Sequence, residues 1–182
     1  MTAKVEHTTI QIPHLLLIAG NGRNVGKTTL ACQIIARFAG EMEVTGLKIT
    51  PHFHPVNKDD VVIQTNNFLI VNETQMSCKD SSLMLQAGAK QVFFVMAKRE
   101  FFHEAVEQLL QLLPKNLIVC ESGGLHEWVT PGIFFMVKRK DEEIVKTHLL
   151  TYSPIIVNND GENFDFDLNR LEFSNRQIII KN

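Results

Sequence analysis

Residues 20–29 combine the residue types needed to bind phosphate, and read Gly-Asn-Gly-Arg-Asn-Val-Gly-Lys-Thr-Thr. Glycines let a backbone curl so that its N–H groups point at phosphate oxygens, at the positive end of a following helix. Lys27 can reach the β- and γ-phosphates of a nucleotide, and the Thr28 hydroxyl can ligate Mg²⁺. We therefore predict a phosphate-binding loop. The residues predicted to contact the nucleotide are Gly22, Arg23, Asn24, Val25, Gly26, Lys27, Thr28 and Thr29.

The spacing of this loop differs from the usual pattern, which has a glycine five positions before Gly26. Asn21 occupies that position, and glycines stand on either side of it. Counting from Gly20 instead gives a loop that is longer by one residue. A glycine-rich turn that binds no nucleotide is the alternative. A lysine and two threonines between an apolar run and an amphipathic segment favour the phosphate-binding interpretation.

Two charged residues outside the loop are further candidates, because they lie where predicted strands end. Ligands collect at the carboxyl ends of the strands in parallel sheets. Lys48 closes the apolar run at 44–49, and Glu121 follows the run at 117–120. An acidic residue at such an exit orients Mg²⁺ or water in phosphate-loop enzymes. We predict that Lys48 and Glu121 act in catalysis with Lys27, the alternatives being a surface lysine and an exposed turn glutamate.

Asp80 and Asn158 each have a functional and a structural interpretation of similar weight. Asp80 is predicted to be a Mg²⁺ ligand with Thr28 and Glu121, although its place before a helical segment also suits a helix cap. Asn158 follows a late strand and is predicted to contact the nucleotide, with an Asx turn as the alternative. His52 and His54 could bind zinc as a pair, but the sequence offers no evident third ligand, so histidines that face solvent or substrate are favoured.

Apolar runs of strand length alternate with segments of helical periodicity along the chain. Strands are predicted at 15–18, 44–49, 91–96, 117–120, 131–138, 153–157 and 177–180, and helices at 27–38, 79–89, 100–113 and near 165–171. This alternation predicts an α/β fold with a mainly parallel sheet and helices on both faces. The runs 61–64 and 68–71 predict a β-hairpin insertion at about 56–75, within a single domain spanning 1–182.

The composition is that of a globular chain without a general affinity for nucleic acid. Hydrophobic residues make up 45% and the formal net charge is −2, so nucleic acid is not predicted as a partner. Neither an apolar run of about eighteen residues nor a basic and apolar leader is present. We therefore predict neither a membrane span nor a secretion signal. The three cysteines lie in or beside apolar segments, which predicts reduced thiols in a cytoplasmic protein.

Three parts of the chain resemble known families. The Gly-x5-Gly-Lys-Thr pattern at 20–28 resembles the loop of dethiobiotin synthetase and its relatives, a class of P-loop NTPases. Lys-Asp-Ser at 79–81 with Ala-Gly-Ala at 87–89 resembles a signature of the molybdopterin-guanine dinucleotide biosynthesis protein B family. Glu121 matches the glutamate that both groups have at this strand exit, whereas Ser122 replaces the glycine that follows it.

The resemblance implies a P-loop NTPase fold and a Mg²⁺-dependent protein that binds ATP or GTP and hydrolyses it slowly. In the second family such a protein assists a partner nucleotidyltransferase, and a homodimer is expected. A lysine at position 48 would meet the phosphates or a second substrate. The alternative is an ATP-dependent carboxylate-activating ligase similar to dethiobiotin synthetase. No Asn-Lys-x-Asp guanine motif is present, so ATP and GTP stay alternatives.

Overall fold

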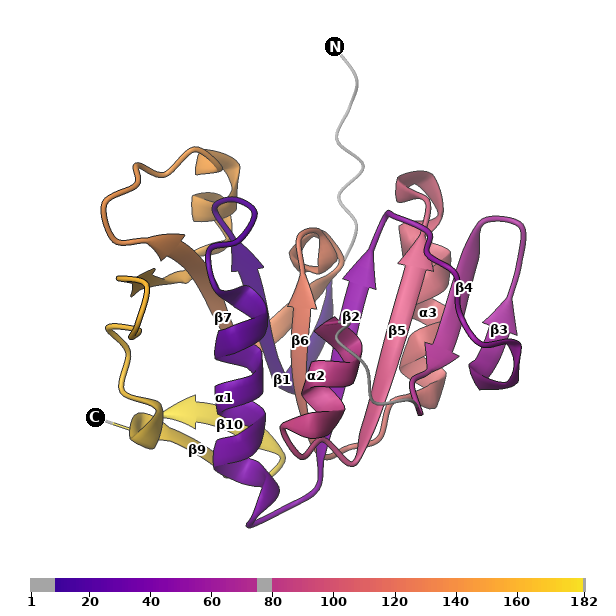
Figure 1. The fold of residues 1–182 in the computed structure, drawn as a ribbon, viewed down its shortest axis with the longest axis horizontal. Coiled ribbons are helices and arrows are strands. Elements are labelled where there is room, and N and C mark those ends of the chain that lie inside the picture. Colours follow the sequence, from indigo (N-terminus) through magenta and orange to yellow (C-terminus); the bar gives the residue numbers. More distant parts are fainter. Residues whose placement is uncertain (1–8, 75–79, 182) are drawn as a thin grey trace.

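An eight-stranded sheet forms the centre of this computed structural model, which describes residues 9–74 and 80–181 (Figure 1). The strands are β1 Ile10–Gly20, β2 Val44–Thr50, β3 Val61–Gln64, β4 Phe68–Asn72, β5 Gln91–Ala97, β6 Leu117–Ser122, β7 Val129–Arg139 and β8 Ile155–Asn159. Their order across the sheet is β3-β4-β5-β2-β6-β1-β7-β8. All neighbouring strands from β5 to β8 in this order are parallel. The pairs β3–β4 and β4–β5 are antiparallel, so β4 alone runs opposite to the other seven strands. The predicted α/β architecture with a mainly parallel sheet is confirmed.

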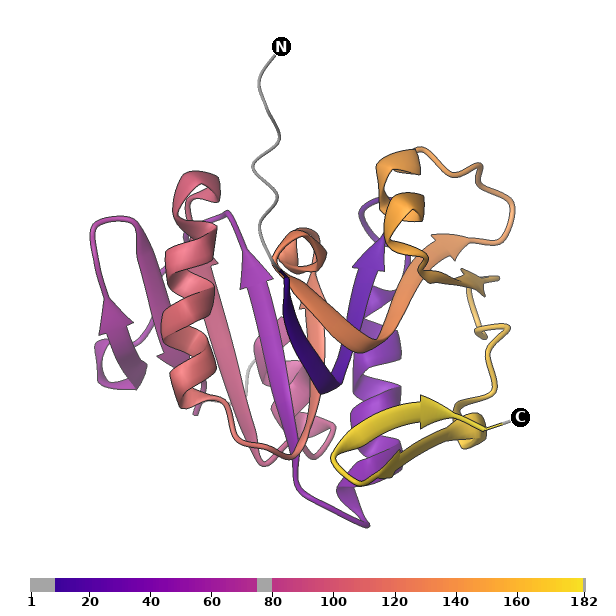
Figure 2. The same ribbon diagram turned by 180° about the vertical axis from the view of Figure 1, so that it is seen from behind.

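Helices cover both faces of the sheet, as Figures 1 and 2 show. The helices are α1 Lys27–Ala39, α2 Asp80–Gln86 and α3 Phe102–Leu112. Phe38 of α1 packs in one core and Leu109 of α3 in the other, while neighbouring residues of β1, Leu16 and Leu17, alternate between these two cores. Burial on both faces explains why the central strands read as continuous apolar runs. None of the helices in the described residues is long and apolar enough to cross a membrane.

The predicted hairpin at 61–71 is present, but it extends the main sheet. β3 and β4 pair antiparallel, and β4 also pairs antiparallel with β5. The Thr65 hydroxyl oxygen accepts hydrogen bonds from the N–H groups of Asn67 and Phe68, which fixes the tight turn. The segment is therefore an added edge of the same sheet.

The C-terminal segment contains the predicted strand at 177–180 but lacks the predicted helix before it. The helix expected near 165–171 is only a 3₁₀ turn at Leu168–Arg170, and it is followed by β9 Leu171–Ser174. β9 forms an antiparallel pair with β10 Gln177–Ile180. The two turn residues, Asn175 and Arg176, have φ values of 51° and 59°, the backbone of a tight hairpin turn. Because the second turn residue is arginine and not glycine, the sequence gives only a weak signal for this hairpin.

Strands β1 and β7 both change direction halfway along their length (Figure 2). Gly132 of β7 faces residues 13–15 of β1, because the register between the two strands shifts at this point. A Cβ atom on Gly132 would lie 2.2 Å from the carbonyl oxygen of Pro13. Only glycine therefore allows the two backbones to approach this closely.

The bend also explains an unusually short connection. Parallel strands of one sheet usually need a crossover of about a dozen residues, but residues 123–128 alone join β6 to β7. Figure 2 shows β7 starting beside the end of β6, running down with the first part of β1, and then turning up into the sheet. The N–H group of Ile10 donates to the carbonyl of Trp128 at 3.0 Å and holds the two strand starts together.

His126 is a buried histidine in this connection. Its ring stacks on Phe134 with 5.6 Å between centroids and meets Tyr152 edge-on at 4.5 Å. Neither ring nitrogen has a hydrogen-bond partner among the described residues. Burial, together with the positive charges of His148 and Lys146, lowers the pKa of His126 from 6.5 to about 4. The imidazole is therefore neutral in the folded protein at neutral pH.

The low pKa of His126 should make stability depend on pH. Because the unfolded chain binds more protons between the two pKa values, stability is full above about pH 6.5 and falls as the pH drops toward about 4. The expected loss is on the order of 2 kcal/mol after allowance for solvent screening. Urea unfolding between about pH 7.5 and 5 measures it. His126→Phe should remove this part of the pH dependence, and His52→Gln, at an exposed position, should not. An equal pH dependence in both variants would contradict the prediction.

Candidate functional site

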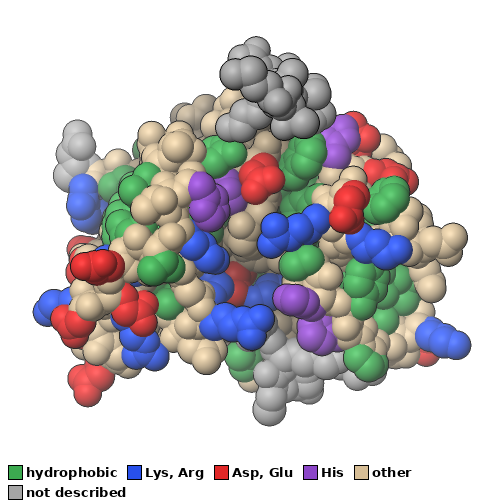
Figure 3. All heavy atoms as spheres, turned by 90° about the horizontal axis from the view of Figure 1, so that it is seen from above, with side chains coloured by type: hydrophobic (Ala, Val, Ile, Leu, Met, Phe, Trp, Pro, Cys, Tyr) green, Lys and Arg blue, Asp and Glu red, His purple; other side chains and the backbone are tan. Residues whose placement is uncertain are grey.

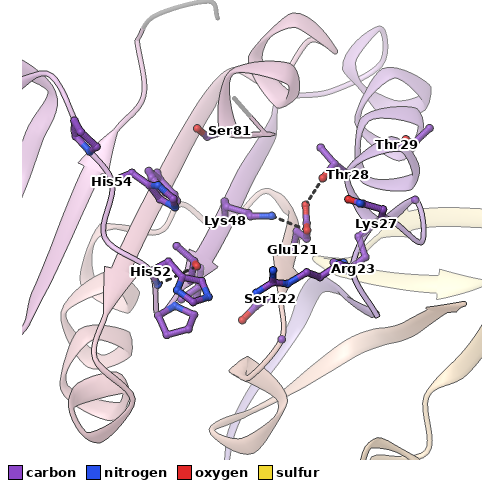
Figure 4. Close-up of a pocket in the computed structure, with 18 residues that line it drawn as sticks. Arg23, Lys27, Thr28, Thr29, Lys48, His52, His54, Ser81, Glu121 and Ser122 are labelled. Atoms are coloured by element: carbon purple, nitrogen blue, oxygen red, sulfur yellow. Dashed lines mark hydrogen bonds and ion pairs between the residues drawn. The ribbon is translucent and has the colours of Figure 1, made fainter. Parts of the chain in front are cut away.

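A cavity of about 1100 Å³ opens at the carboxyl edge of the sheet, where β1, β2 and β6 end. In the view onto this edge, Lys and Arg side chains gather around a hollow (Figure 3). The predicted site residues that line the cavity are Arg23, Asn24, Gly26, Lys27, Thr28, Thr29, Lys48 and Glu121. Most of the remaining lining comes from the segment 49–55, which follows β2. The fold thus brings candidates from three distant parts of the sequence into one cavity (Figure 4).

The loop between β1 and α1 depends on two of its glycines. Gly26, directly before α1, has a φ of 99°, a left-handed conformation that glycine adopts without strain. A Cβ atom on Gly20 would lie 2.6 Å from Cδ of Lys27, so glycine leaves room for the lysine stem to fold back across the loop. The Lys27 ammonium donates to the carbonyl oxygen of Gly22 at 3.0 Å. Gly20 and Gly26 are therefore the two positions where the loop needs glycine. These are the two glycines of the Gly-x5-Gly spacing that counts from Gly20.

Glu121 joins the loop to the neighbouring strand β2. Its Oε2 accepts a hydrogen bond from the Thr28 hydroxyl at 2.7 Å, and its Oε1 lies 2.6 Å from the Lys48 ammonium (Figure 4). The strand register places Lys48 directly beside Glu121. The Glu121 side chain is only 4% exposed, so its charge needs both partners. Glu121 lies inside β6, which continues to Ser122, and the alternative of an exposed turn residue is wrong.

Asn21 has a supporting role that the sequence interpretation missed. It stands where the usual pattern has glycine, and it is 2% exposed. Its amide group donates to the carbonyl oxygen of Glu143 at 2.8 Å and accepts from the N–H groups of Val145 and Lys146 at 2.8 and 3.2 Å. The segment 143–146 is therefore anchored to the loop. The signal in the sequence that pointed to a special role for this residue was the replacement of glycine by asparagine at position 21.

The structure places Asn158 away from the cavity, and its neighbour contacts the loop instead. The backbone N–H and side-chain amide of Asn158 both donate to the Asp165 carboxylate, at 2.7 and 2.6 Å. Asn159 donates from its amide to the carbonyl oxygen of Val25 at 2.9 Å. Val25 itself buries its side chain in the apolar core. Asn158 therefore does not line the cavity, and its predicted nucleotide contact is not supported. The Asx turns of this segment belong to the next two residues, because the N–H of Gly161 donates to Asn159 Oδ1 and that of Glu162 to Asp160 Oδ1.

Asp80, Ser81 and the two histidines come from α2 and from the segment after β2. Asp80 begins α2, but its side chain lies outside the described residues, so its role as a Mg²⁺ ligand stays a prediction. Ser81 lines the cavity and donates to Glu73 at 2.9 Å. His52 and His54 also line it. Within the described residues, no group of three or more His, Cys, Asp or Glu side chains could hold a metal ion, so zinc has no support there.

In comparisons with known proteins, the chain matched no protein-family model, no curated protein and no solved structure. The family resemblance of the three sequence segments is therefore untested by homology. The functional inference rests on the cavity, the loop and the contacts of Glu121.

Proposed function

We propose that this chain is a P-loop NTPase, a Mg²⁺-dependent protein that binds ATP or GTP and hydrolyses it slowly. The observation that carries the proposal is the placement of Glu121 between the Thr28 hydroxyl and the Lys48 ammonium, beside the glycine loop. In phosphate-loop enzymes, the hydroxyl after the loop lysine meets Mg²⁺, and a carboxylate nearby orients the metal or the attacking water. The contacts of Thr28 and Glu121 match this division of roles.

The charge of the cavity also favours a polyphosphate ligand. Three basic side chains, Arg23, Lys27 and Lys48, line it together with one carboxylate, Glu121, although the whole chain has a net charge of −2. The first turn of the 13-residue helix α1 faces the same cavity, and a helix N-terminus presents N–H groups and a positive dipole end to an anion. An excess of positive charge at this place complements a chain of phosphates.

The residues present fit a Mg²⁺ ion. The Thr28 hydroxyl donates a hydrogen bond to Glu121, so the lone pairs of its oxygen remain available for a cation. Mg²⁺ takes few protein ligands beside phosphate and water oxygens, which suits one hydroxyl with one carboxylate behind it. When bound, Mg²⁺ would draw negative charge from the β- and γ-phosphate oxygens. Lys27 would hold these phosphates, while Glu121 would orient Thr28 and the attacking water.

Glu121→Gln tests this proposal. The variant should keep Mg²⁺-nucleotide affinity within about threefold but lower the hydrolysis rate about a hundredfold, because glutamine keeps the shape and loses the charge. Calorimetry gives the affinity and phosphate release gives the rate. Glu104→Gln, at an exposed position on α3, is the control. Equal rates in wild type and Glu121→Gln would refute the role of Glu121, and a wild type that binds neither ATP nor GTP with Mg²⁺ would refute the proposed function.

Among NTPase functions, our first choice is a helper protein that assists the enzyme attaching a nucleotide to the molybdenum cofactor. Lys-Asp-Ser at 79–81 and Ala-Gly-Ala at 87–89 resemble the family that has this role. This choice implies a nucleotidyltransferase partner, a homodimer and a cytoplasmic location. The second candidate is the ATP-dependent carboxylate-activating ligase. One observation favours it, because the cavity continues past Lys48 along residues 49–55 to Phe94, which gives room for a second small ligand.

The two functions differ in what should stimulate turnover. A ligase holds its carboxylate substrate beside the γ-phosphate, so that substrate should raise phosphoryl transfer by orders of magnitude. A helper NTPase turns over slowly alone and should respond to its protein partner. We would measure turnover with a panel of small carboxylates, amino acids and diamines, and separately with a candidate nucleotidyltransferase. Strong stimulation by a small molecule, with none by the protein, would reverse our order of preference.

A further inference from the structure

Arg23 differs from Lys27 and Lys48, the other two basic residues of the cavity, in having no hydrogen-bond or ion-pair partner among the described residues. The Lys48 ammonium is paired with Glu121 at 2.6 Å, and the Lys27 ammonium donates to the Gly22 carbonyl at 3.0 Å. Arg23 is exposed and makes no hydrogen bond or ion pair with the residues that the structure describes. Among the lysine and arginine side chains that line the cavity, Arg23 can therefore bind an anion without breaking a hydrogen bond or ion pair to the described part of the chain.

The Arg23 side chain reaches into the part of the cavity where Glu121 lies. Figure 4 shows it extending from the loop toward Ser122, across the space in front of Glu121 and away from the first turn of α1. Lys27 and Thr28, in contrast, lie at that first turn. Arg23 and Lys27 thus approach the cavity from different directions, with Glu121 between the loop and β2.

The backbone that carries Arg23 is held in place from both sides. Asn24, the next residue, has a φ of 54°, and its carbonyl oxygen accepts a hydrogen bond from the Arg139 guanidinium at 3.1 Å. Asn21, two residues earlier, is bonded to the segment 143–146. The backbone on either side of Arg23 is therefore anchored to residues 139–146, while the Arg23 side chain is exposed and makes no hydrogen bond or ion pair with the described residues. This combination suits a residue that closes onto a bound ligand.

We propose that Arg23 is a catalytic residue that contacts the γ-phosphate and stabilises the charge that builds up during hydrolysis. The inference rests on the proposed NTPase function and adds the residue that supplies this charge from within the same chain. A guanidinium suits the role because it is always charged and presents two N–H groups to two oxygens at once. An arginine placed in this way acts mainly on the rate and less on ground-state binding.

In the reaction, the water oxygen forms a bond to the γ-phosphorus. The bond between that phosphorus and the β,γ-bridging oxygen breaks, and its electron pair stays on the nucleoside diphosphate. One water proton remains on the released phosphate, and the other passes to solvent. Arg23 forms and breaks no covalent bond in this step, and its role is to neutralise charge on the γ-phosphate and bridging oxygens.

The test compares Arg23→Ala, Arg23→Lys and the control Arg99→Ala in the full chain. Arg99 lies in the 3₁₀ turn Arg99–Phe101, is exposed and does not line the cavity. Arg23→Ala should lower kcat about a hundredfold or more, while the Kd for Mg²⁺-nucleoside diphosphate changes by less than about threefold. Arg23→Lys should recover part of the rate, since lysine keeps the charge and loses the planar fork. Arg99→Ala should match the wild type.

A transition-state analogue gives a second measurement that a structural role would not affect. Wild-type protein should bind nucleoside diphosphate much more tightly when aluminium fluoride and Mg²⁺ are present, and Arg23→Ala should lose most of this gain. Equal kcat in wild type and Arg23→Ala would overturn the inference while leaving the NTPase function standing. Equal losses of diphosphate and triphosphate affinity with kcat unchanged would make Arg23 a general phosphate contact and also overturn it. A wild type that binds no nucleotide would instead remove the proposed function itself.

Discussion

Lys27→Ala should lower the affinity for Mg²⁺-nucleoside triphosphate about a hundredfold and leave the fold intact. A charged hydrogen bond to phosphate contributes about 1.5–3 kcal/mol, and a hundredfold change in Kd corresponds to about 2.7 kcal/mol. The side chain lines the cavity, and its ammonium group donates to the Gly22 carbonyl within the same loop. Its loss should therefore affect the ligand far more than the packing.

Calorimetric titration with ATP and with GTP, each with Mg²⁺, measures the effect of Lys27→Ala. Lys90→Ala is a matched control, because its side chain is 69% exposed and pairs with Glu43 at the long distance of 3.8 Å. The thermal midpoint of both variants should remain close to that of the wild type. If Lys27→Ala binds both nucleotides as the wild type does, the phosphate-binding loop is assigned to the wrong residues.

The sequence predicts those parts of the site that depend on local patterns. Gly26, Lys27 and Thr28 stand between a buried strand and an amphipathic helix, and a short stretch of chain determines that arrangement. Lys48 and Glu121 were also predictable, because residues at the carboxyl ends of neighbouring parallel strands meet at one edge. To predict the ion pair between them as well, one would need to know only that β2 and β6 are neighbours in the sheet.

Contacts between residues far apart in the sequence could not be predicted in this way. Asn21 bonds to the segment 143–146, and Asn159 bonds to the carbonyl of Val25. Nothing in the pattern around Asn158 and Asn159 shows which of the two amides points at the loop. A difference of one position in a strand reverses the face to which a side chain points. The choice therefore depends on the exact end of β8 and on the bond between Asn158 and Asp165.

The bends of β1 and β7 also could not be predicted from local sequence patterns. Pro13 and Gly132 each suggest an irregular strand, but neither indicates that the two irregularities face each other. Their pairing requires β1 and β7 to be neighbours, which the predicted list of strands does not specify. The bends then decide how β6 connects to β7, and so they determine the shape of the segment that follows Glu121.

Gly132→Ala should destabilise the folded protein by about 3 kcal/mol, because the new Cβ atom would overlap backbone. The nearest atom would be the carbonyl oxygen of Pro13 at 2.2 Å, followed by the Pro13 carbonyl carbon and Cγ2 of Ile178, each at 3.0 Å. A side chain could rotate away, but this oxygen belongs to the bend of β1 and can move only with the strand. Overpacking of this kind costs about 1–3 kcal/mol, and the backbone contact places Gly132 at the upper end.

Thermal unfolding followed by circular dichroism measures the effect of Gly132→Ala. For a chain of this length, about 3 kcal/mol corresponds to a fall in Tm of roughly 6–12 °C. Gly40→Ala is the matched control, since its φ is −76° and a Cβ atom there would meet nothing within 4 Å. It should change Tm little or raise it slightly, because alanine restricts the unfolded chain.

The two substitutions add the same methyl group, so equal Tm values would show that β1 and β7 do not approach each other as closely as the structure places them. Below its own transition, Gly132→Ala should still bind Mg²⁺-nucleotide with wild-type affinity, because the bend lies away from the carboxyl edge where the cavity opens.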